Sequence, residues 1–374
     1  ERHNDGLDYV PTHKGVLFGH HFAAIAGAGP LVGPVLAAQM GYLPGTLWII
    51  FGVVFAGAVQ DMMVLFVSMR RDGKSLGDIV KQELGTVPGV IASIGILMIM
   101  VIIMAVLALI VVKALVHSPW GTFTIAATMP IALFMGIYTR YIRPGKIGEI
   151  SIVGFILLML AVIYGDNVAH SSIGHWFDLD GIQLTWAIMI YGFVASVLPV
   201  WLLLTPRDYL STFLKIGTIV ALAIGILIVS PALQMPAVTH FIDGSGPVFS
   251  GALFPFLFIT IACGAVSGFH ALISSGTTPK MLENETHVRM IGYGGMLMES
   301  FVAIMALAAA ASLDPGVYFA MNSPAALIGT DANTAAEVIT TKLQFSVDAA
   351  TLLHTAKEVG ENTILSRAGG APTL

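Results

Sequence analysis

Long apolar runs dominate this chain, and most polar positions fall between them. The runs have the length of about 17–25 residues that an α-helix needs to cross a bilayer. A membrane β-barrel would instead show short strands of alternating apolar and polar residues. The pattern predicts an all-α polytopic membrane protein with about nine transmembrane helices. The expected spans are residues 17–42, 45–69, 88–112, 122–138, 149–164, 186–204, 213–231, 251–273 and 290–311.

The first apolar run contains several residues that interrupt helices. Proline removes a backbone donor, and glycine lowers helix propensity. Backbone groups freed in this way at membrane depth are tolerated only inside protein or against a polar cavity. We therefore expect a broken helix whose backbone lines a substrate site. The helix-breaking residues are Gly27, Gly29, Pro30, Gly33 and Pro34, and the expected substrate contacts are Ala26, Gly27, Gly29 and Gly33.

The sixth run, 186–204, is also interrupted, by Gly192 and Pro199. It lies five segments after the first run and enters the membrane from the opposite side. Two such helices are the pattern of a five-plus-five inverted repeat, a common transporter architecture. Single Gly and Pro residues also occur in ordinary membrane helices, so this interpretation stays open.

Charge supports a membrane protein and sets its orientation. Hydrophobic residues make up 56% of the chain and charged residues 10%, whereas soluble domains have about 25% charged residues. Lys and Arg gather in alternate connections, and the opposite set contains only Lys113, Lys342, Lys357 and Arg367. The positive-inside rule then places the start of the chain in the cytoplasm. We expect a fragment of a longer protein, because the chain starts at Glu1 and ends within a second Gly/Pro-rich stretch.

Three ionisable residues are expected at a common depth in the membrane. Asp61 lies nine residues before Arg70, and Glu299 lies ten after Arg289, which places them about 13 and 15 Å along their helices. His270 lies ten residues before Lys280. Ionisable groups at this depth are costly and mark functional sites, near the midplane where secondary transporters bind substrate and coupling ion. We assign ion coupling to Asp61, Glu299 and His21, with structural partnership as the alternative.

Hydroxyl groups surround His270 and extend the expected site. Hydroxyls and free backbone donors at a helix end are suited to hold a carboxylate or an ion. Interhelical hydrogen bonding through small residues is an equally good explanation. His20 and His21 are adjacent on a helix and face about 100° apart, so at least one of them is structural. The expected substrate contacts here are Ser267, His270, Ser274, Ser275 and Thr277.

Several functional classes are disfavoured by missing motifs. The chain has no GxxxxGK[ST] nucleotide-binding loop and no HExxH motif, and its basic residues are dispersed rather than clustered for nucleic acid. Its single cysteine, Cys263, excludes a CxxC motif. We expect no enzyme activity, no cofactor and no resident metal. The competing hypothesis is a membrane redox or metal protein that uses His20, His21 and His270 as ligands.

The chain contains several long and specific motifs: GHHFAAIAGAGPLVGPVLAAQMGYLPGTLW, AGAVQDMMVLFVSMRRDGKSLG, LPVWLLLTPRDYLSTFLKIG, ACGAVSGFHALISSGTTPKM, IGYGGMLMES, DPGVYFAMNSP and TILSRAGGAPTL. These motifs resemble the bacterial carbon starvation protein A family, over almost the full chain from Arg2 to Leu374. The resemblance implies a protein that is longer at both ends.

The resemblance implies a multi-pass inner-membrane transporter. Family members are implicated in peptide uptake, and a close branch in pyruvate uptake by proton symport. Distant similarity groups the family with the amino acid–polyamine–cation superfamily, whose fold is an inverted repeat. No site residue is carried over from the family. The expected domains are a transmembrane transporter core at 1–311, an extracytoplasmic loop region at 312–362 and the start of a further Gly/Pro-rich membrane element at 363–374.

The expected partners are a small-molecule substrate, protons and the lipid bilayer. Peptides and pyruvate both present a carboxylate, so both substrates stay open. Protons and Na⁺ use the same oxygen ligands, so both coupling ions stay open as well. The residues leave the oligomeric state undetermined.

Overall fold

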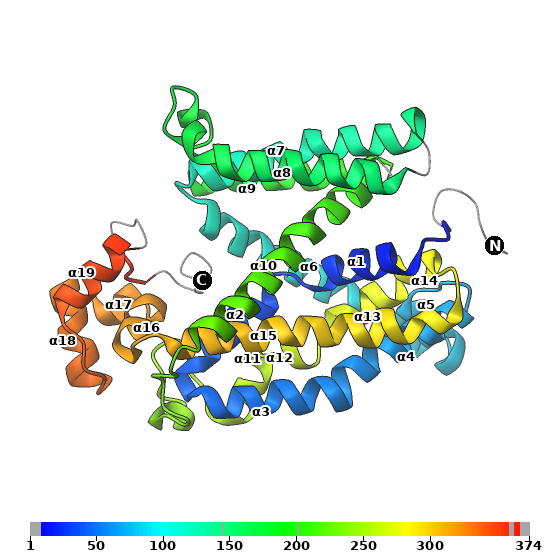
Figure 1. Cartoon of the computed structure of the whole chain (residues 1–374). Helices are drawn as coiled ribbons and strands as arrows, with labels where there is room; N and C mark the ends of the chain where they lie inside the picture. The colour runs from blue at the N-terminus through cyan, green and yellow to red at the C-terminus, as the bar shows by residue number, and fades with distance from the viewer. Residues whose placement is uncertain (1–8, 144–145, 200–201, 359–362, 367–374) are drawn as a thin grey trace. The chain divides into compact units, whose positions relative to one another are not determined.

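The computed structural model describes residues 9–143, 146–199, 202–358 and 363–366. The described part is helical without a named strand, and one isolated β-bridge pairs Thr12 with Leu282. The all-α prediction is therefore confirmed for these residues. The chain forms two compact units (Figure 1). Unit 1 comprises Glu1–Lys14, Ile25–Leu76 and Val220–Leu374, and unit 2 comprises Gly15–Ala24 and Gly77–Ile219.

Unit 1 contains the interrupted helices. Its membrane elements are α2 (Gly29–Ala37), η1 (Ala38–Met40), α3 (Tyr42–Gly52), η2 (Val53–Gly57), α4 (Ala58–Arg70), η6 (Leu253–Leu257), α11 (Phe258–Thr260), α12 (Ala262–Ala265), α13 (Gly268–Ser275), η8 (Arg289–Tyr293) and α15 (Gly294–Ser312). Its connecting and C-terminal elements are η5 (His240–Asp243), α14 (Thr278–Met281), η7 (Glu285–His287), α16 (Pro315–Asn322), α17 (Ala325–Ile328), α18 (Ala332–Lys342) and α19 (Ala349–Glu358).

Unit 2 is built mainly from longer helices. They are α6 (Thr86–Leu115), α7 (Pro119–Ile137), α8 (Ile147–Ala169) and α9 (Gly181–Val197). Two short elements lie between them, η3 (Tyr138–Ile142) and η4 (Gly174–Trp176). Three helices contain a boundary between the units: α1 (Lys14–Ile25), α5 (Leu76–Leu84) and α10 (Leu204–Val229). Within unit 2, α7 and α8 pack side by side along their length (Figure 1).

Six described helices are long and apolar enough to cross a membrane, which makes this a multi-pass membrane protein. They are Tyr42–Arg70, Thr86–Leu115, Pro119–Ile142, Gly148–Ala169, Pro206–Val229 and Glu285–Ser312. The broken pair of α1 and α2 gives a seventh if it is one span. The sixth expected span appears as the shorter apolar helix α9. The expected number of nine stays a prediction.

The predicted break in the first run is confirmed, but its position is earlier than the prolines suggest. Helix α1 ends at Ile25, and α2 begins at Gly29. Pro30 lies in the first turn of α2, where a missing N–H removes no helical hydrogen bond. Pro34 lies inside the helix. The segment 26–28, which contains Gly27, therefore separates the two helices, and the proline pair does not.

The eighth expected span, 251–273, is not one continuous helix. It consists of η6, α11, α12 and α13, with Val266 and Ser267 in extended conformation between the last two. Gly264 and Gly268 flank this extended pair and provide only a weak helix-breaking signal in the sequence. Unit 1 therefore contains a second interruption, directly before His270.

Helix α15 lies at the centre of unit 1 and packs against α2 and α3 (Figure 1). Four of its buried positions are alanines: Ala303, Ala306, Ala310 and Ala311 are at most 1% exposed. Small residues let helix backbones approach closely, which is a principal source of helix association in membranes. The broken helix α2 therefore lies directly against a fully spanning helix.

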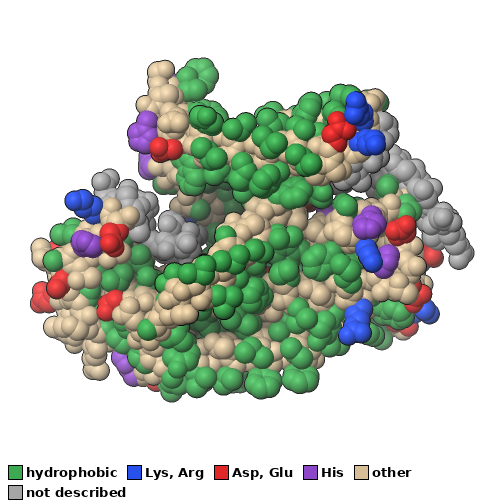
Figure 2. Space-filling model, in the orientation of Figure 1, with side chains coloured by type: hydrophobic (Ala, Val, Ile, Leu, Met, Phe, Trp, Pro, Cys, Tyr) green, Lys and Arg blue, Asp and Glu red, His purple; other side chains and the backbone are tan. Residues whose placement is uncertain are grey.

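The helices expose large apolar side chains along their length, and charged side chains gather toward helix ends (Figure 2). On α6, Val87 is 70% exposed and Leu97 is 63% exposed. Such long apolar faces would be unfavourable in water, and a bilayer provides the matching solvent.

Gly33 lets α2 pack against the interrupted segment around Thr260. A Cβ at position 33 would lie 2.3 Å from the backbone oxygen of Thr260, whereas a Cβ at Gly27 would meet nothing within 4 Å. We therefore expect Gly33→Ala to lower the free energy of unfolding by about 1–3 kcal/mol through overpacking. Gly27→Ala is the matched control and should change the unfolding temperature of purified protein little. Equal unfolding temperatures for the two variants would contradict this packing.

Tyr318 ties α16 to the carboxyl end of α2. Its hydroxyl group donates to the carbonyl oxygens of Val35, at 2.7 Å, and Leu36, at 3.0 Å, and its side chain is 0% exposed. Tyr318→Phe removes this donor and leaves buried carbonyl groups with less hydrogen bonding, so we expect a loss of about 1–3 kcal/mol. Thermal unfolding in detergent measures it. Tyr164→Phe, at a 55% exposed tyrosine, should have no comparable effect.

Candidate functional site

Three ionisable side chains from three elements meet inside unit 1. Asp61 comes from α4, His270 from α13 and Glu299 from α15, and all three are 0% exposed. His270 Nδ1 lies 2.9 Å from Asp61 Oδ2, and His270 Nε2 lies 3.0 Å from Glu299 Oε2. The sequence predicted these residues at one depth, and the structure brings them into contact. We call them the central triad.

Close backbone packing and one polar anchor position the triad. A Cβ at Gly292 would lie 2.8 Å from Met62 Cα, so η8 passes directly beside α4. The interruption places Ser267 directly before α13, at its N-cap position. Gln60 Nε2 donates to the carbonyl oxygen of Ser267 at 2.7 Å. The hydrogen bond from Gln60, the residue before Asp61, to Ser267, three residues before His270, therefore holds these two side chains close together.

The triad can hold different numbers of protons. Both ring nitrogens of His270 donate only when the ring is a cation, and each carboxylate then accepts one hydrogen bond. A neutral ring donates from one nitrogen, and its other nitrogen needs a protonated carboxyl group or another partner. Charges without solvent are costly unless they are paired, so proton number and charge are linked here.

Some hydrogen-bonding capacity of the triad is unused. His270 Nε2, Asp61 Oδ1 and Glu299 Oε2 are buried and have no hydrogen-bond partner, although His270 Nε2 and Glu299 Oε2 lie at ion-pair distance. The hydroxyl oxygen of Ser274, one turn after His270 on α13, is buried without a partner as well. Buried polar atoms are nearly always paired in proteins, so these atoms have the capacity to bind a further proton, water molecule, ion or ligand.

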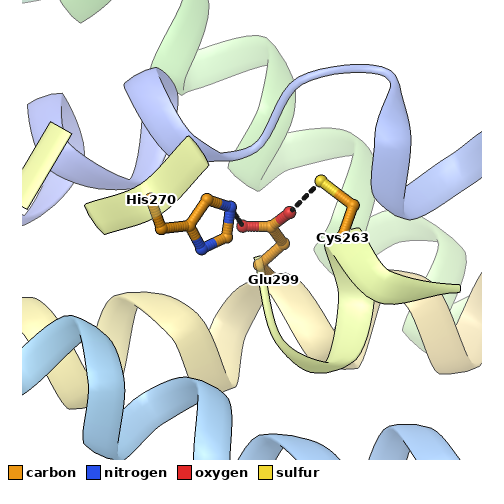
Figure 3. Close-up of side chains that lie close together, drawn as sticks. All are labelled: Cys263, His270 and Glu299. Atoms are coloured by element: carbon orange, nitrogen blue, oxygen red, sulfur yellow. Dashed lines mark hydrogen bonds and ion pairs between the residues drawn. The ribbon is translucent and has the colours of Figure 1, made fainter. Parts of the chain in front are cut away.

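Cys263 links the triad to the broken helix. Its thiol group lies 3.5 Å from Glu299 Oε1 (Figure 3). It lies 3.8 Å from the hydroxyl oxygen of Ser267. A Cβ at Gly29 would lie 2.5 Å from Cys263 Sγ, so the start of α2 lies against this thiol. The first turn of a helix has backbone N–H groups without intrahelical partners. The amino-terminal end of α2 and Glu299 of the triad therefore both lie next to Cys263.

Sequence reasoning missed Cys263 and the anchoring role of Gln60. Cys263 precedes His270 by seven residues, a spacing that places two side chains on one face of a continuous helix. That signal did not apply, because the helix is interrupted at Val266 and Ser267. Met296 was also missed; its sulfur lies 3.1 Å from His270 Nδ1.

The other predicted substrate contacts have varied surroundings. Ala26 is 7% exposed, and Gly27 is exposed. The hydroxyl group of Ser275 donates to the carbonyl oxygen of Ala271 within its own helix at 2.7 Å. Thr277 is exposed. The structure thus gives Gly33 and Ser275 structural contacts, and the assignment of these residues to substrate stays a prediction.

His20 and His21 belong to the part of α1 that lies in unit 2. His20 Nδ1 lies 3.9 Å from Asp208 Oδ2, and His21 is 0% exposed. The coupling role of His21 stays a prediction. Within the residues that the structure describes, one group of three has metal-ligand spacing: Cys263, His270 and Glu299. It shares only His270 with the ligand set expected for a redox protein.

Comparison with known proteins gives consistent matches. The family described as Carbon starvation protein CstA matches residues 1–374. The peptide transporter CstA of Escherichia coli (strain K12) is 69% identical over 378 residues, covering 100% of this chain and 54% of that protein. The pyruvate/proton symporter BtsT of the same organism is 60% identical over 393 residues, covering 99% of this chain and 55% of that protein.

A more distant relative, the peptide transporter CstA of Bacillus subtilis (strain 168), is 52% identical over 319 residues, covering 85% of this chain and 53% of that protein. This chain therefore spans about half the length of the curated relatives it matches. No solved structure matches it. The relatives' names are those of transporters, and they do not favour the redox or metal hypothesis.

The position of His270 between two buried carboxyl groups predicts a large stability effect. His270→Gln removes the only ring that contacts both groups, and loss of one partner from a buried ion pair costs about 3–5 kcal/mol. We expect a correspondingly lower unfolding temperature for the purified protein. His354→Gln, at a histidine whose side chain is 72% exposed, is the control. Unfolding of His270→Gln at the wild-type temperature would contradict an ion-paired triad.

Proposed function

Because this chain belongs to the carbon starvation protein CstA family, we propose that it is the membrane core of a proton-coupled secondary transporter. It imports a small carboxylate nutrient, a short peptide or pyruvate, across the bacterial inner membrane. The observation that carries the proposal is the fully buried Asp61–His270–Glu299 triad. The names of the relatives, one a peptide transporter and one a pyruvate/proton symporter, support it.

The triad supplies the coupling step. Asp61 or Glu299 takes up the proton, and His270, in contact with both, passes charge between them by donating from one ring nitrogen or from two. Because the triad is shielded from water, a change of proton number alters its net charge in a low-dielectric surrounding. Such a change is strong enough to favour one conformation of the surrounding helices over another.

The broken helix supplies the substrate contacts. The start of α2, at Gly29, presents a backbone N–H group and the positive end of a helix dipole, which favour a carboxylate. Ser267 and Ser274 add hydroxyl groups on the opposite segment. Contact between Gly29 and Cys263, and between Cys263 and Glu299, supports a short path from the bound carboxylate to the coupling group. Binding of the substrate and the proton is therefore coupled through adjacent atoms.

The proposed orientation, lipid contacts and architecture follow from charge, exposed apolar surface and the interrupted helices. The basic connections place the start of the chain in the cytoplasm under the positive-inside rule. The exposed apolar faces of the helices contact lipid. Inverted-repeat architecture, with binding at interrupted helices near the midplane, fits a transporter of this kind.

Proteoliposomes that contain the full-length protein test this function. Uptake of labelled pyruvate and of a labelled dipeptide is measured in the presence of a metal chelator, with and without an imposed pH gradient. We expect the gradient to accelerate uptake of one substrate. Asp61→Asn or Glu299→Gln should reduce the gradient-driven part about tenfold or more, within the range of a coupling free energy of about 1–3 kcal/mol.

Two exposed carboxyl groups provide matched controls for these variants. Asp166 and Glu358 have side chains that are 73% and 65% exposed. Asp166→Asn and Glu358→Gln should retain the gradient dependence. Uptake no faster than in empty vesicles would refute both substrates. Uptake that stays fully gradient-dependent in Asp61→Asn and in Glu299→Gln would refute the coupling assignment.

A further inference from the structure

The neighbourhood of Glu299 has the donor set of a transition-metal site. Cys263, His270 and Glu299 each offer one donor atom, and these atoms lie within 4.8 Å of one another. Glu299 lies between the other two, with one carboxylate oxygen 3.5 Å from Cys263 Sγ and the other 3.0 Å from His270 Nε2 (Figure 3). Tetrahedral Zn²⁺ holds S, N and O ligands about 3.3–3.6 Å apart. The separation of Cys263 Sγ from Glu299 Oε1 lies within this range, and that of His270 Nε2 from the other oxygen, Oε2, is somewhat shorter.

The hydrogen bonding of His270 prepares it as a ligand. Its Nδ1 lies 2.9 Å from Asp61 Oδ2, which favours a proton on Nδ1 and leaves a lone pair on Nε2. That Nε2 lies 3.0 Å from Glu299 Oε2, at ion-pair distance, and both atoms are buried. A cation bound by both atoms would replace this direct contact. Carboxylate–histidine–metal arrangements of this kind recur at zinc sites.

The chemistry of the donors selects the class of ion. A thiolate, an imidazole and a carboxylate together suit Zn²⁺, Co²⁺ and Cd²⁺, whereas Mg²⁺ and Ca²⁺ prefer oxygen ligands alone. With Cys263 and Glu299 ionised and His270 neutral, the three ligands match the charge of a divalent ion, and Asp61 adds one negative charge beside His270. Three protein ligands leave one coordination position for water or another small molecule.

We propose that Cys263, His270 and Glu299 bind a thiophilic divalent ion of the Zn²⁺ class, and that Asp61 orients His270 for this ion. Binding rests on geometry alone and does not depend on the proposed transport. Its consequence does rest on the proposed function: an ion held by His270 and Glu299 occupies the groups assigned to coupling. Zn²⁺ is therefore an inhibitor of uptake.

Cobalt titration of the purified, metal-stripped full-length protein, prepared without a polyhistidine tag, tests the site. We expect one Co²⁺ per chain, with a near-ultraviolet thiolate-to-cobalt charge-transfer band that Zn²⁺ abolishes by displacement. Cys263→Ser should lose the band. Asp61→Asn should weaken the affinity about 10–100-fold, the usual effect of removing the partner of a ligating histidine. His354→Gln, at an exposed histidine, should bind as the wild type does.

A second measurement uses wild-type protein only, so it does not depend on the folding of a variant. Cys263 is the single cysteine of the chain. Any further cysteine in the full-length protein is replaced before the labelling, and Cys263 and its neighbours keep the wild-type sequence. Zn²⁺ should slow maleimide labelling of Cys263 at least tenfold, and Mg²⁺ should not. Labelling that Zn²⁺ leaves unchanged, or a cobalt band absent from the wild type, would overturn the proposal. Stoichiometric Co²⁺ binding that persists with equal affinity in His270→Gln and Cys263→Ser would also overturn it.

The uptake consequence is measured separately in proteoliposomes. Zn²⁺ should reduce wild-type uptake, and a chelator should restore it. Uptake by Cys263→Ser is expressed relative to that variant's own metal-free uptake. Half-maximal inhibition of this variant should need a Zn²⁺ concentration at least tenfold higher than for the wild type. Metal binding in detergent uses neither substrate nor gradient, so its failure is distinguishable from a failure of the transport proposal, which is tested in the presence of chelator.

Discussion

The burial of a histidine between two carboxyl groups is the constraint on which the rest of unit 1 depends. Asp61, His270 and Glu299 come from three elements and share no contact with water. An isolated charge at this depth would cost several kcal/mol, whereas charges that contact one another offset part of that cost. The helices α4, α13 and α15 must therefore keep their relative positions for the triad to be stable. Small residues and glycines along these helices allow that close approach.

Interruptions in two membrane segments provide polar backbone groups near this triad. One lies between α1 and α2, and the other lies before α13. A continuous helix satisfies its own backbone, so only interrupted ones can offer N–H and C=O groups to a side chain or a ligand at membrane depth. Gln60 uses one such carbonyl group, that of Ser267. The start of α2 provides further donors next to Cys263, and these are suited to a substrate carboxylate.

The same cluster has two possible occupants in our interpretation, a coupling proton and a divalent metal ion. Both follow from one geometric fact, that His270 Nε2 and Glu299 Oε2 are buried and lie 3.0 Å apart. A proton shared by these atoms, or a cation bound by both, suits this pair. Cys263 discriminates between the occupants, because a thiolate strengthens metal binding and is not required for proton transfer. A site built to exchange protons is thus open to thiophilic ions.

The sequence by itself determined the class of the protein and the break in the first membrane segment, and it predicted a common depth for the three ionisable residues. These properties are local: apolar runs of membrane length, clustered glycines and helical rise along one segment determine them. The residues of the triad could therefore be predicted, whereas their contacts could not. The interruption before His270 had only a weak signal in Gly264 and Gly268.

The contacts of Asp61, Cys263 and Gln60 were decided by the tertiary structure alone. Asp61 is 209 positions from His270 along the chain, and Gln60 is 207 positions from Ser267. Spacing along one helix carries no information about which other helix packs against it. Close backbone approach at Gly29, Gly33 and Gly292 sets those pairings, and it appears only when the segments are packed together.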